Sequence, residues 1–353
     1  MADILVLGAG VMGSAFSVLL ADRGHKVNLI GTHLDTDLIR GILRDGIHEK
    51  LKVKLPDRIV ASTHGHLEEV LSDRTDLIVY GVNSAGVQWA NRQLGRLLKK
   101  STPILMLTKG LAVQNHAIRI LPQIVRQDML DFGLSDISVG AVAGPCIAAE
   151  LAARRQSSVV ITHPDLELLQ WLLKLVDAPY YHARPSTDIV GIEVCAALKN
   201  FYAIGVGYAN GQLESEGTAA NGALMHNLAA GLFVQAINEI KYFLNYMGAD
   251  AESVYGLAGV GDLYVTCQAG RNSRMGRHLG AGLSYIEAKT RYMPNDTVEG
   301  AELILTIAPA LRRLIDQKEI DETALPLGLA IMNTVCGDAP LHIPWDQFYL
   351  ESW

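Results

Sequence analysis

In the first half of the chain, short apolar runs alternate with longer segments of mixed polarity. The short runs are rich in β-branched residues and are typical of strands buried on both faces of a parallel sheet. We expect strands at residues 4–7, 27–30, 77–80, 103–107, 137–139 and 158–161. Segments with helical periodicity separate most of these runs, and the first of them spans residues 14–23. Alternation of this kind predicts a doubly wound α/β domain.

The pattern changes at about residues 185–188, after which we expect no strand. Long helical stretches follow at residues 189–209, 224–247 and 285–291. A chain of 353 residues is long enough for two hydrophobic cores. We therefore predict the α/β class, with a Rossmann-type doubly wound sheet in residues 1–187 and an all-helical substrate domain in residues 188–353.

Composition narrows the class of protein. Hydrophobic residues make up 49% of the chain, which is typical of a globular protein and excludes a disordered one. The net charge of −7 argues against nucleic-acid binding through bulk electrostatics, so an anionic substrate needs a local basic site. The apolar start lacks a basic segment and is interrupted by glycines, which favours a strand and helix over a signal peptide or membrane span.

The four cysteines lie far apart in the sequence. They are Cys146, Cys195, Cys267 and Cys336, with no closely spaced pair and no histidine spacing typical of zinc. We expect no metal site, and reduced thiols in a cytoplasmic protein.

A glycine-rich turn follows the first expected strand and opens the first expected helix, with the spacing Gly8-x-Gly10-x-x-Gly13. In a dinucleotide fold, Gly8 permits the tight turn, Gly10 lets the backbone approach a pyrophosphate, and Gly13 lets helix and strand pack closely. A turn of this composition without a ligand is the alternative. The position between strand and helix favours dinucleotide binding.

The choice between NAD and NADP stays open. An acidic residue after the second strand binds the ribose hydroxyls, whereas a basic residue favours a 2′-phosphate. Here Thr32 and His33 follow that strand and could contact a phosphate, while Asp35 lies further along. We expect neither cofactor to be strongly excluded.

Lys199 and Asn200 lie in an apolar run rich in small residues that we expect to be a buried helix. Burying an ammonium group without a partner costs several kcal/mol. Lys199 therefore either takes part in chemistry or forms a structural ion pair, with Glu193 or Asp262 as the candidate partners.

Two other basic positions stand where ligands commonly bind. Lys109 directly follows an expected strand, and open α/β sheets bind ligands at the carboxyl ends of their strands. Arg271 and Asn272 stand at an expected helix start, which combines a guanidinium group with free backbone N–H groups for a phosphate. A solvated loop lysine and an arginine in a surface loop are the respective alternatives.

The ordered set of motifs resembles the NAD(P)-dependent sn-glycerol-3-phosphate dehydrogenase family over nearly the whole chain, with some likeness to its archaeal branch. The motifs are Gly8-Ala-Gly-Val-Met-Gly13, Thr108-Lys-Gly-Leu111, Gly144-Pro145, Ala197-Leu-Lys-Asn200, Gly261-Asp-Leu263, Gly270-Arg-Asn272 and Val298-Glu-Gly300. The resemblance implies reversible reduction of dihydroxyacetone phosphate with NAD or NADP.

The resemblance also implies roles for single residues. Lys199 would give and take the proton at the C2 oxygen, and Lys109 would contact the substrate. The implied substrate and alignment residues are Gly144, Cys146, Asn200, Asp262, Thr266, Arg271 and Asn272. The expected cofactor contacts are Gly8, Gly10, Val11, Met12, Gly13, Thr32, His33, Lys109, Ala148, Arg271 and Glu299.

Several positions depart from the family pattern. Cys146 stands where the family usually has a hydroxyl residue, and a thiol is a weaker hydrogen-bond donor. Met12, Ala143 and the pair Asn83-Ser84 also differ. Two alternatives stay open: the same chemistry on a related phosphorylated ketose or a 2-keto acid, and a non-catalytic dinucleotide-binding sensor. The apolar helical domain suggests a homodimer.

Overall fold

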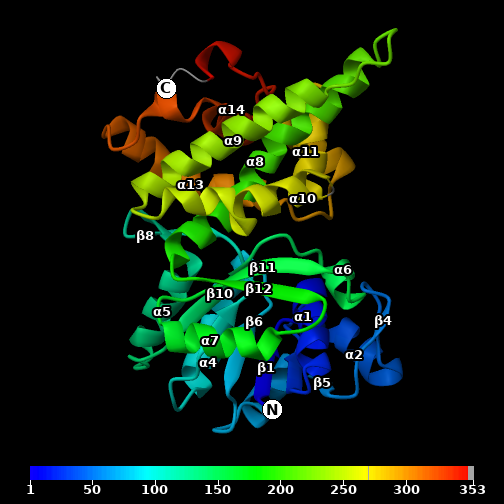
Figure 1. Ribbon diagram of the computed structural model, residues 1–353, viewed down its shortest axis with the longest axis vertical. Helices are drawn as coiled ribbons and strands as arrows, with labels where there is room; N and C mark the ends of the chain where they lie inside the picture. Colours follow the sequence, from blue (N-terminus) through cyan, green and yellow to red (C-terminus); the bar gives the residue numbers. More distant parts are fainter. Residues whose placement is uncertain (269, 349–353) are drawn as a thin grey trace. The chain divides into compact units, whose positions relative to one another are not determined.

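The chain folds into two compact units (Figure 1). The computed structural model describes residues 1–268 and 270–348, so Ala269 and the last five residues of the predicted helical domain lie outside it. The first unit comprises Met1–Lys109 and Ile120–Ile189. The second comprises Gly110–Arg119 and the residues from Val190 onward.

An eight-stranded sheet forms the centre of the first unit, in the order β12-β11-β10-β7-β6-β1-β2-β5. The strands are β1 (Asp3–Leu7), β2 (Lys26–Ile30), β5 (Ile59–Ser62), β6 (Leu77–Tyr80), β7 (Ile104–Met106), β10 (Val139–Ala143), β11 (Ser157–Thr162) and β12 (Tyr181–Ser186). The six strands β5, β2, β1, β6, β7 and β10 are parallel, β11 runs antiparallel to β10, and β12 is parallel to β11. The predicted sheet is thus confirmed, with a reversed pair of strands at one edge.

Helices and a short hairpin complete the first unit. They are α1 (Val11–Asp22), α2 (Thr36–Asp45), α3 (Leu67–Val70), α4 (Val87–Leu97), α5 (Leu121–Asp131), α6 (Ala148–Ala152), α7 (Leu166–Val176), and the hairpin of β3 (Ile47–His48) and β4 (Val53–Lys54). Residues 4–7 of β1 are completely buried, as expected of a central parallel strand. Helix α1 packs against α6 and α7 and is buried along most of its length.

Five of the six expected strands are present within two residues of their predicted bounds, but the run at 137–139 is displaced. The strand there is β10, which contains Gly140 and Ala141. A Cβ atom on Gly140 would lie 3.0 Å from the carbonyl oxygen of Thr162 on the neighbouring strand. Close packing between the two strands therefore favours small residues, which carry little strand signal of their own.

Helices form the second unit, apart from the hairpin of β8 (Leu111–Gln114) and β9 (Ala117–Ile120). They are α8 (Ile189–Glu216), α9 (His226–Tyr246), α10 (Asp262–Gln268), α11 (Arg271–Gly280), α12 (Tyr285–Glu287), α13 (Glu299–Asp316) and α14 (Pro326–Gly337). The described part of the chain after residue 188 contains no strand, which agrees with the expected all-helical region. The predicted fold class is confirmed.

Helix α8 is the central element of the second unit. It is long and apolar enough to cross a membrane, but 83% of its most apolar window is buried inside the protein, as in the core helix of a globular unit. Two of its glycines face α11 at very short range. A Cβ atom on Gly207 would lie 2.3 Å from the Ser273 carbonyl oxygen, and one on Gly211 would lie 2.0 Å from that of Arg277. Glycine therefore lets the two backbones touch.

A buried carboxylate joins α9 to the start of α14. Glu239 is completely buried, and its two oxygens accept hydrogen bonds of 2.7 Å from the backbone N–H groups of Leu327 and Gly328. The Tyr202 hydroxyl and the Gln235 amide also donate to it, at 2.9 and 2.8 Å. Burial raises the pKa of Glu239 to about 7, although these hydrogen bonds oppose the shift.

This raised pKa predicts that stability falls as the pH rises. The unfolded chain releases the Glu239 proton near its ordinary pKa of 4.5, whereas the folded chain keeps it until about pH 7. The free energy of unfolding should therefore decrease between these two values, by about 3 kcal/mol in total. Denaturant titrations from pH 5 to 8 measure this slope.

Glu239→Gln should be less stable than the wild type at pH 5, because one backbone N–H group loses its acceptor. The variant should also lose most of the downward slope, so the difference in stability narrows towards pH 8. Glu322→Gln, at an exposed position, is the matched control and should keep the slope. An unchanged slope in Glu239→Gln would contradict the prediction.

Candidate active site

The glycine-rich turn joins the end of β1 to the start of α1. Gly8 has a φ of +114°, and a Cβ atom on it would lie 2.6 Å from the Gly81 backbone. A Cβ on Gly13 would lie 2.1 Å from the Gly8 carbonyl oxygen. A Cβ on Gly10, in contrast, would meet nothing within 4 Å, and no side chain caps the helix there. The open space and the uncapped N-terminus of α1 fit a pyrophosphate.

A buried histidine that the sequence analysis did not single out holds this turn. His48 is completely buried, and its Nδ1 accepts a hydrogen bond of 3.1 Å from the Leu51 N–H group. Its Nε2 therefore carries the proton and donates to the Ala9 carbonyl oxygen at 3.1 Å. The Ser14 hydroxyl donates to the same oxygen at 3.0 Å. His48 lies 39 residues from Ala9, and no sequence pattern marks the contact.

The end of β2 presents Thr32 and His33. The Thr32 N–H and hydroxyl groups both donate to one oxygen of Asp35, at 2.8 Å each, so this carboxylate is already engaged within its own turn. The His33 ring packs near Trp89, with 5.8 Å between the ring centroids. One oxygen of the Asp35 carboxylate is thus held by Thr32 within the same turn.

The carboxyl ends of β7 and β10 bring Lys109 and Gly144 together. The two strands are parallel neighbours, so the loops that follow them emerge at the same edge of the sheet. Lys109 Nζ lies 3.5 Å from the Gly144 carbonyl oxygen. Cys146 and Ala148 follow in the same loop and at the start of α6, where both are partly buried against the core. Met12 packs against the same core, whereas Val11 is exposed.

In the second unit, the Lys199 side chain is only 10% exposed and lies against α10. Its Nζ donates to an Asp262 carboxylate oxygen and to the Thr266 hydroxyl, the latter at 2.9 Å. The Thr266 hydroxyl in turn donates to the Asp262 backbone carbonyl at 2.7 Å. The pairing with Asp262 is one of the two ion pairs considered from the sequence. The arrangement holds a largely dehydrated ammonium group in a defined position.

A π-helical turn, Leu257–Gly261, leads into α10 and sets the position of Asp262. The Gly261 N–H group donates to the Gly256 carbonyl oxygen, five residues earlier, at 3.2 Å. Turns of this kind are rare and occur frequently at functional sites.

Asn200, next to Lys199, connects α8 to α11 and α13. The Asn272 amide donates to the Asn200 side-chain oxygen at 3.0 Å and accepts from the Gly300 N–H group at 2.8 Å. A Cβ on Gly300 would lie 2.2 Å from the Asn200 carbonyl oxygen, so only glycine fits there. Arg271, the first residue of α11, pairs with Glu299, the first residue of α13.

The predicted site residues thus form two groups, one in each unit. The first contains the glycine turn, the residues after β2, and the pair Lys109 and Gly144. The second contains the cluster around Lys199 and the contacts of Asn200, Arg271 and Asn272. Among the described residues, no group of three or more histidine, cysteine or acidic side chains is placed to hold a metal ion.

A dinucleotide turn on a mostly parallel sheet, followed by a helical unit with a buried lysine, defines the class of two-domain Rossmann-type dehydrogenases. Family models agree with this class. The model for the N-terminus of NAD-dependent glycerol-3-phosphate dehydrogenase matches residues 3–169, and the C-terminal model matches residues 188–342. The chain belongs to the NAD(P)-dependent glycerol-3-phosphate dehydrogenase family.

Individual relatives support the assignment. The NADP(+)-dependent glycerol-3-phosphate dehydrogenase of Archaeoglobus fulgidus is 33% identical over 81% of this chain and 82% of its own. The glycerol-3-phosphate dehydrogenase [NAD(P)+] of Protochlamydia amoebophila is 31% identical over 96% of this chain and 94% of its own. The solved glycerol-3-phosphate dehydrogenase of Coxiella burnetii has the same fold, with a TM-score of 0.80 at 24% identity, over 98% and 97% of the two chains.

These comparisons confirm the predicted family, the class of enzyme and the dependence on NAD(P). The archaeal relative agrees with the expected likeness to that branch. The chain is therefore an NAD(P)-dependent oxidoreductase of this family.

Proposed function

We propose that this enzyme transfers a hydride between NAD(P)H and C2 of dihydroxyacetone phosphate, giving sn-glycerol 3-phosphate, with Lys199 as the proton donor and acceptor. Family membership supports the reaction. The observation that carries the role of Lys199 is its burial in a hydrogen-bonded cluster with Asp262 and Thr266. A buried ammonium group held in this way suits proton transfer as well as charge stabilisation.

The proposed chemistry follows from the charges involved. The bound nicotinamide supplies or accepts the hydride. Hydride addition to a ketone carbon leaves negative charge on its oxygen, which Lys199 Nζ would neutralise by giving up a proton. Asp262 and Thr266 would orient the ammonium group for this transfer, and Lys109 would add a second positive charge near the substrate.

The start of α11 is the proposed binding site for the substrate phosphate. Arg271 supplies a guanidinium group, and α11 contributes the positive end of its helix dipole. The Asn272 side chain is fixed by Asn200 and Gly300, which anchors the first turn of α11 beside Arg271. Gly144 and Cys146 are the proposed substrate contacts of the first unit.

For the cofactor, we propose that the pyrophosphate lies on the turn from Gly8 to Gly13, with Val11 and Met12 beside it. Thr32 and His33 would contact the adenosine ribose, and Lys109, Ala148, Arg271 and Glu299 would complete the site. Acceptance of both NADH and NADPH is supported by the residues after β2, since neither Thr32 nor His33 is acidic and one oxygen of Asp35 is already held by Thr32.

Residues 1–187 would form the dinucleotide-binding domain and residues 188–353 the substrate domain, in a cytoplasmic homodimer. The widely spaced cysteines support the location. Sedimentation at micromolar concentration measures the state of assembly.

Steady-state assays test the proposed reaction. The purified protein should oxidise NADH and NADPH with dihydroxyacetone phosphate. The loss of absorbance of the reduced nicotinamide measures the rate. For dihydroxyacetone without the phosphate, kcat/KM should be at least about 100-fold lower, because the phosphate contacts at α11 are then absent. Good turnover of a 2-keto acid, with none of dihydroxyacetone phosphate, would overturn the proposal.

A further inference from the structure

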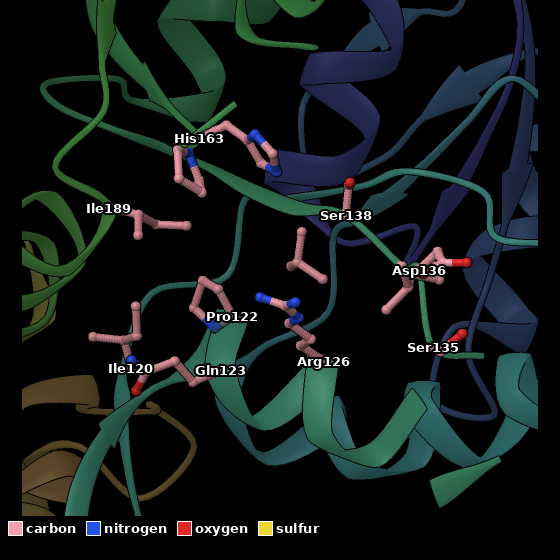
Figure 2. Close-up of a pocket in the computed structure, with 12 residues that line it drawn as sticks. Ile120, Pro122, Gln123, Arg126, Ser135, Asp136, Ser138, His163 and Ile189 are labelled. Atoms are coloured by element: carbon pink, nitrogen blue, oxygen red, sulfur yellow. The ribbon is translucent and has the colours of Figure 1, made fainter. Parts of the chain in front are cut away.

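A cavity in the first unit is lined by none of the predicted site residues. It has a volume of about 440 Å³, within the range of small-molecule sites. The start of α5, the segment that leads into β10 and the residues after β11 line it (Figure 2). Ile189, the first residue of α8, completes the lining.

The cavity and the glycine turn lie at opposite ends of the parallel strands. Gly8, Lys109 and Gly144 follow the carboxyl ends of β1, β7 and β10, which are parallel. Ser138 and Val139, in contrast, stand at the amino end of β10. A strand of five residues is roughly 17 Å long, which separates the two ends by that distance. A ligand in this cavity is therefore distinct from the pyrophosphate.

His163 supplies a buried donor. It is only 5% exposed, and its Nδ1 accepts a hydrogen bond of 2.9 Å from the Asp165 N–H group. Burial lowers its pKa, so the ring is neutral and carries its proton on Nε2. No protein group in the described part of the chain accepts from this nitrogen.

Arg126 supplies a positive charge on the opposite side. Figure 2 shows its guanidinium group directed into the cavity from below, with the His163 ring above it. Arg126 is exposed, with no ion pair recorded for it within residues 1–268 and 270–348, and its charge adds to burial in lowering the pKa of His163. It lies about one turn into α5, whose N-terminal residues line the cavity and whose N-cap, Ile120, offers no side-chain acceptor.

An unpaired guanidinium group, a buried N–H donor and an uncapped helix start all favour negative charge. The apolar part of the wall includes Pro122, Pro164 and Ile189, and the polar part includes Gln123, Ser138 and, further from Arg126 and His163, Asp136 (Figure 2). We propose that this cavity binds a small organic anion, a phosphate monoester or carboxylate with a short apolar body. Its charged group lies between Arg126 and His163, and its apolar body lies against the prolines and Ile189.

This position connects the ligand to the helix that carries Lys199. Ile189 opens α8, and Ile120 is the residue at which the chain re-enters the first unit after the hairpin of the second. Both residues line the cavity. The cavity wall thus includes the first-unit residue at two of the three points at which the chain passes between the units.

Isothermal titration calorimetry with hexyl phosphate tests the proposal, in the presence of saturating NADPH so that the dinucleotide site is filled. We expect one saturable site per chain. Hexanol and inorganic phosphate should each bind at least about tenfold more weakly, since each offers only half of the required chemistry. Hexanoate replaces the phosphate by a carboxylate and shows which anion is preferred.

Arg126→Met should weaken hexyl phosphate binding by about tenfold or more, because it removes the charge at an exposed position where folding is not at risk. Arg96→Met, an exposed arginine at the end of α4, is the matched control and should bind as the wild type does. His163→Phe removes the buried N–H donor and should likewise weaken hexyl phosphate binding. Equal binding by wild type and Arg126→Met, absence of saturation, or displacement by NADPH would overturn the proposal, whatever the substrate of the enzyme proves to be.

Discussion

Lys199→Ala is expected to abolish turnover of dihydroxyacetone phosphate, with a loss in kcat of about 10³-fold or more, while NADPH still binds. The loss follows from the removal of the only proposed proton donor at the C2 oxygen. NADPH binding should survive because the glycine turn belongs to the first unit. Initial rates give kcat, and fluorescence titration gives the dissociation constant of NADPH.

This variant alone does not separate chemistry from stability. Without Lys199, the Asp262 carboxylate stays buried with its charge uncompensated, since its side chain is only 2% exposed. Breaking such a pair costs about 3–5 kcal/mol of stability. The double variant Lys199→Ala with Asp262→Asn removes the charge and should recover most of that loss.

The two possible roles of Lys199 then give opposite results. If the lysine were only structural, the double variant would recover activity together with stability. We expect it to recover stability and stay inactive. Lys241→Ala, which removes a partly exposed lysine of the same unit, controls for the change of charge and should keep full activity.

The second large effect is expected in the glycine turn, where two similar substitutions should both weaken NADPH binding, for different physical reasons. Gly10→Ala adds a methyl group in open space, so the protein should fold normally. That methyl group occupies the space that a pyrophosphate needs, and NADPH binding should weaken by about tenfold or more.

Gly13→Ala, in contrast, places a Cβ 2.1 Å from a backbone oxygen that cannot move independently. It should lower the free energy of unfolding by about 1–3 kcal/mol and also impair NADPH binding. Thermal unfolding and NADPH titration of both variants measure the two effects. Gly41→Ala in α2 meets no neighbouring atom and serves as the control, with unchanged or slightly higher stability. Equal stability of Gly13→Ala and Gly10→Ala would contradict this account.

Local patterns predict much of this fold. The strands β1, β2 and β6 are apolar and β-branched, and their bounds follow directly from composition. The sheet also contains β5 and β12, which lie outside the six expected strands. In β12, Arg184 and Pro185 interrupt any apolar run. An edge strand tolerates such residues, since one of its sides forms no ladder.

The contacts within the site are predicted less completely from the sequence than the strands are. The glycine turn is local, and its spacing alone predicts where a pyrophosphate fits. The contact of Lys199 with Asp262 joins residues 63 positions apart, and only the resemblance to a family linked them in advance. The support of Ala9 by His48 has no signal in a single sequence, because it depends on how a short hairpin folds back over the turn.

The π turn before α10 constrains the length of the chain as well as its composition. An α-helix advances by about 100° per residue, so one residue more or fewer between Val254 and Asp262 would swing the carboxylate to another face of α10. The turn also has no room for a larger residue at Gly259, where a Cβ would lie 1.9 Å from the Val254 carbonyl oxygen. Insertions and deletions, which surface loops absorb readily, are therefore expected to be as damaging in this segment as the replacement of Asp262 itself.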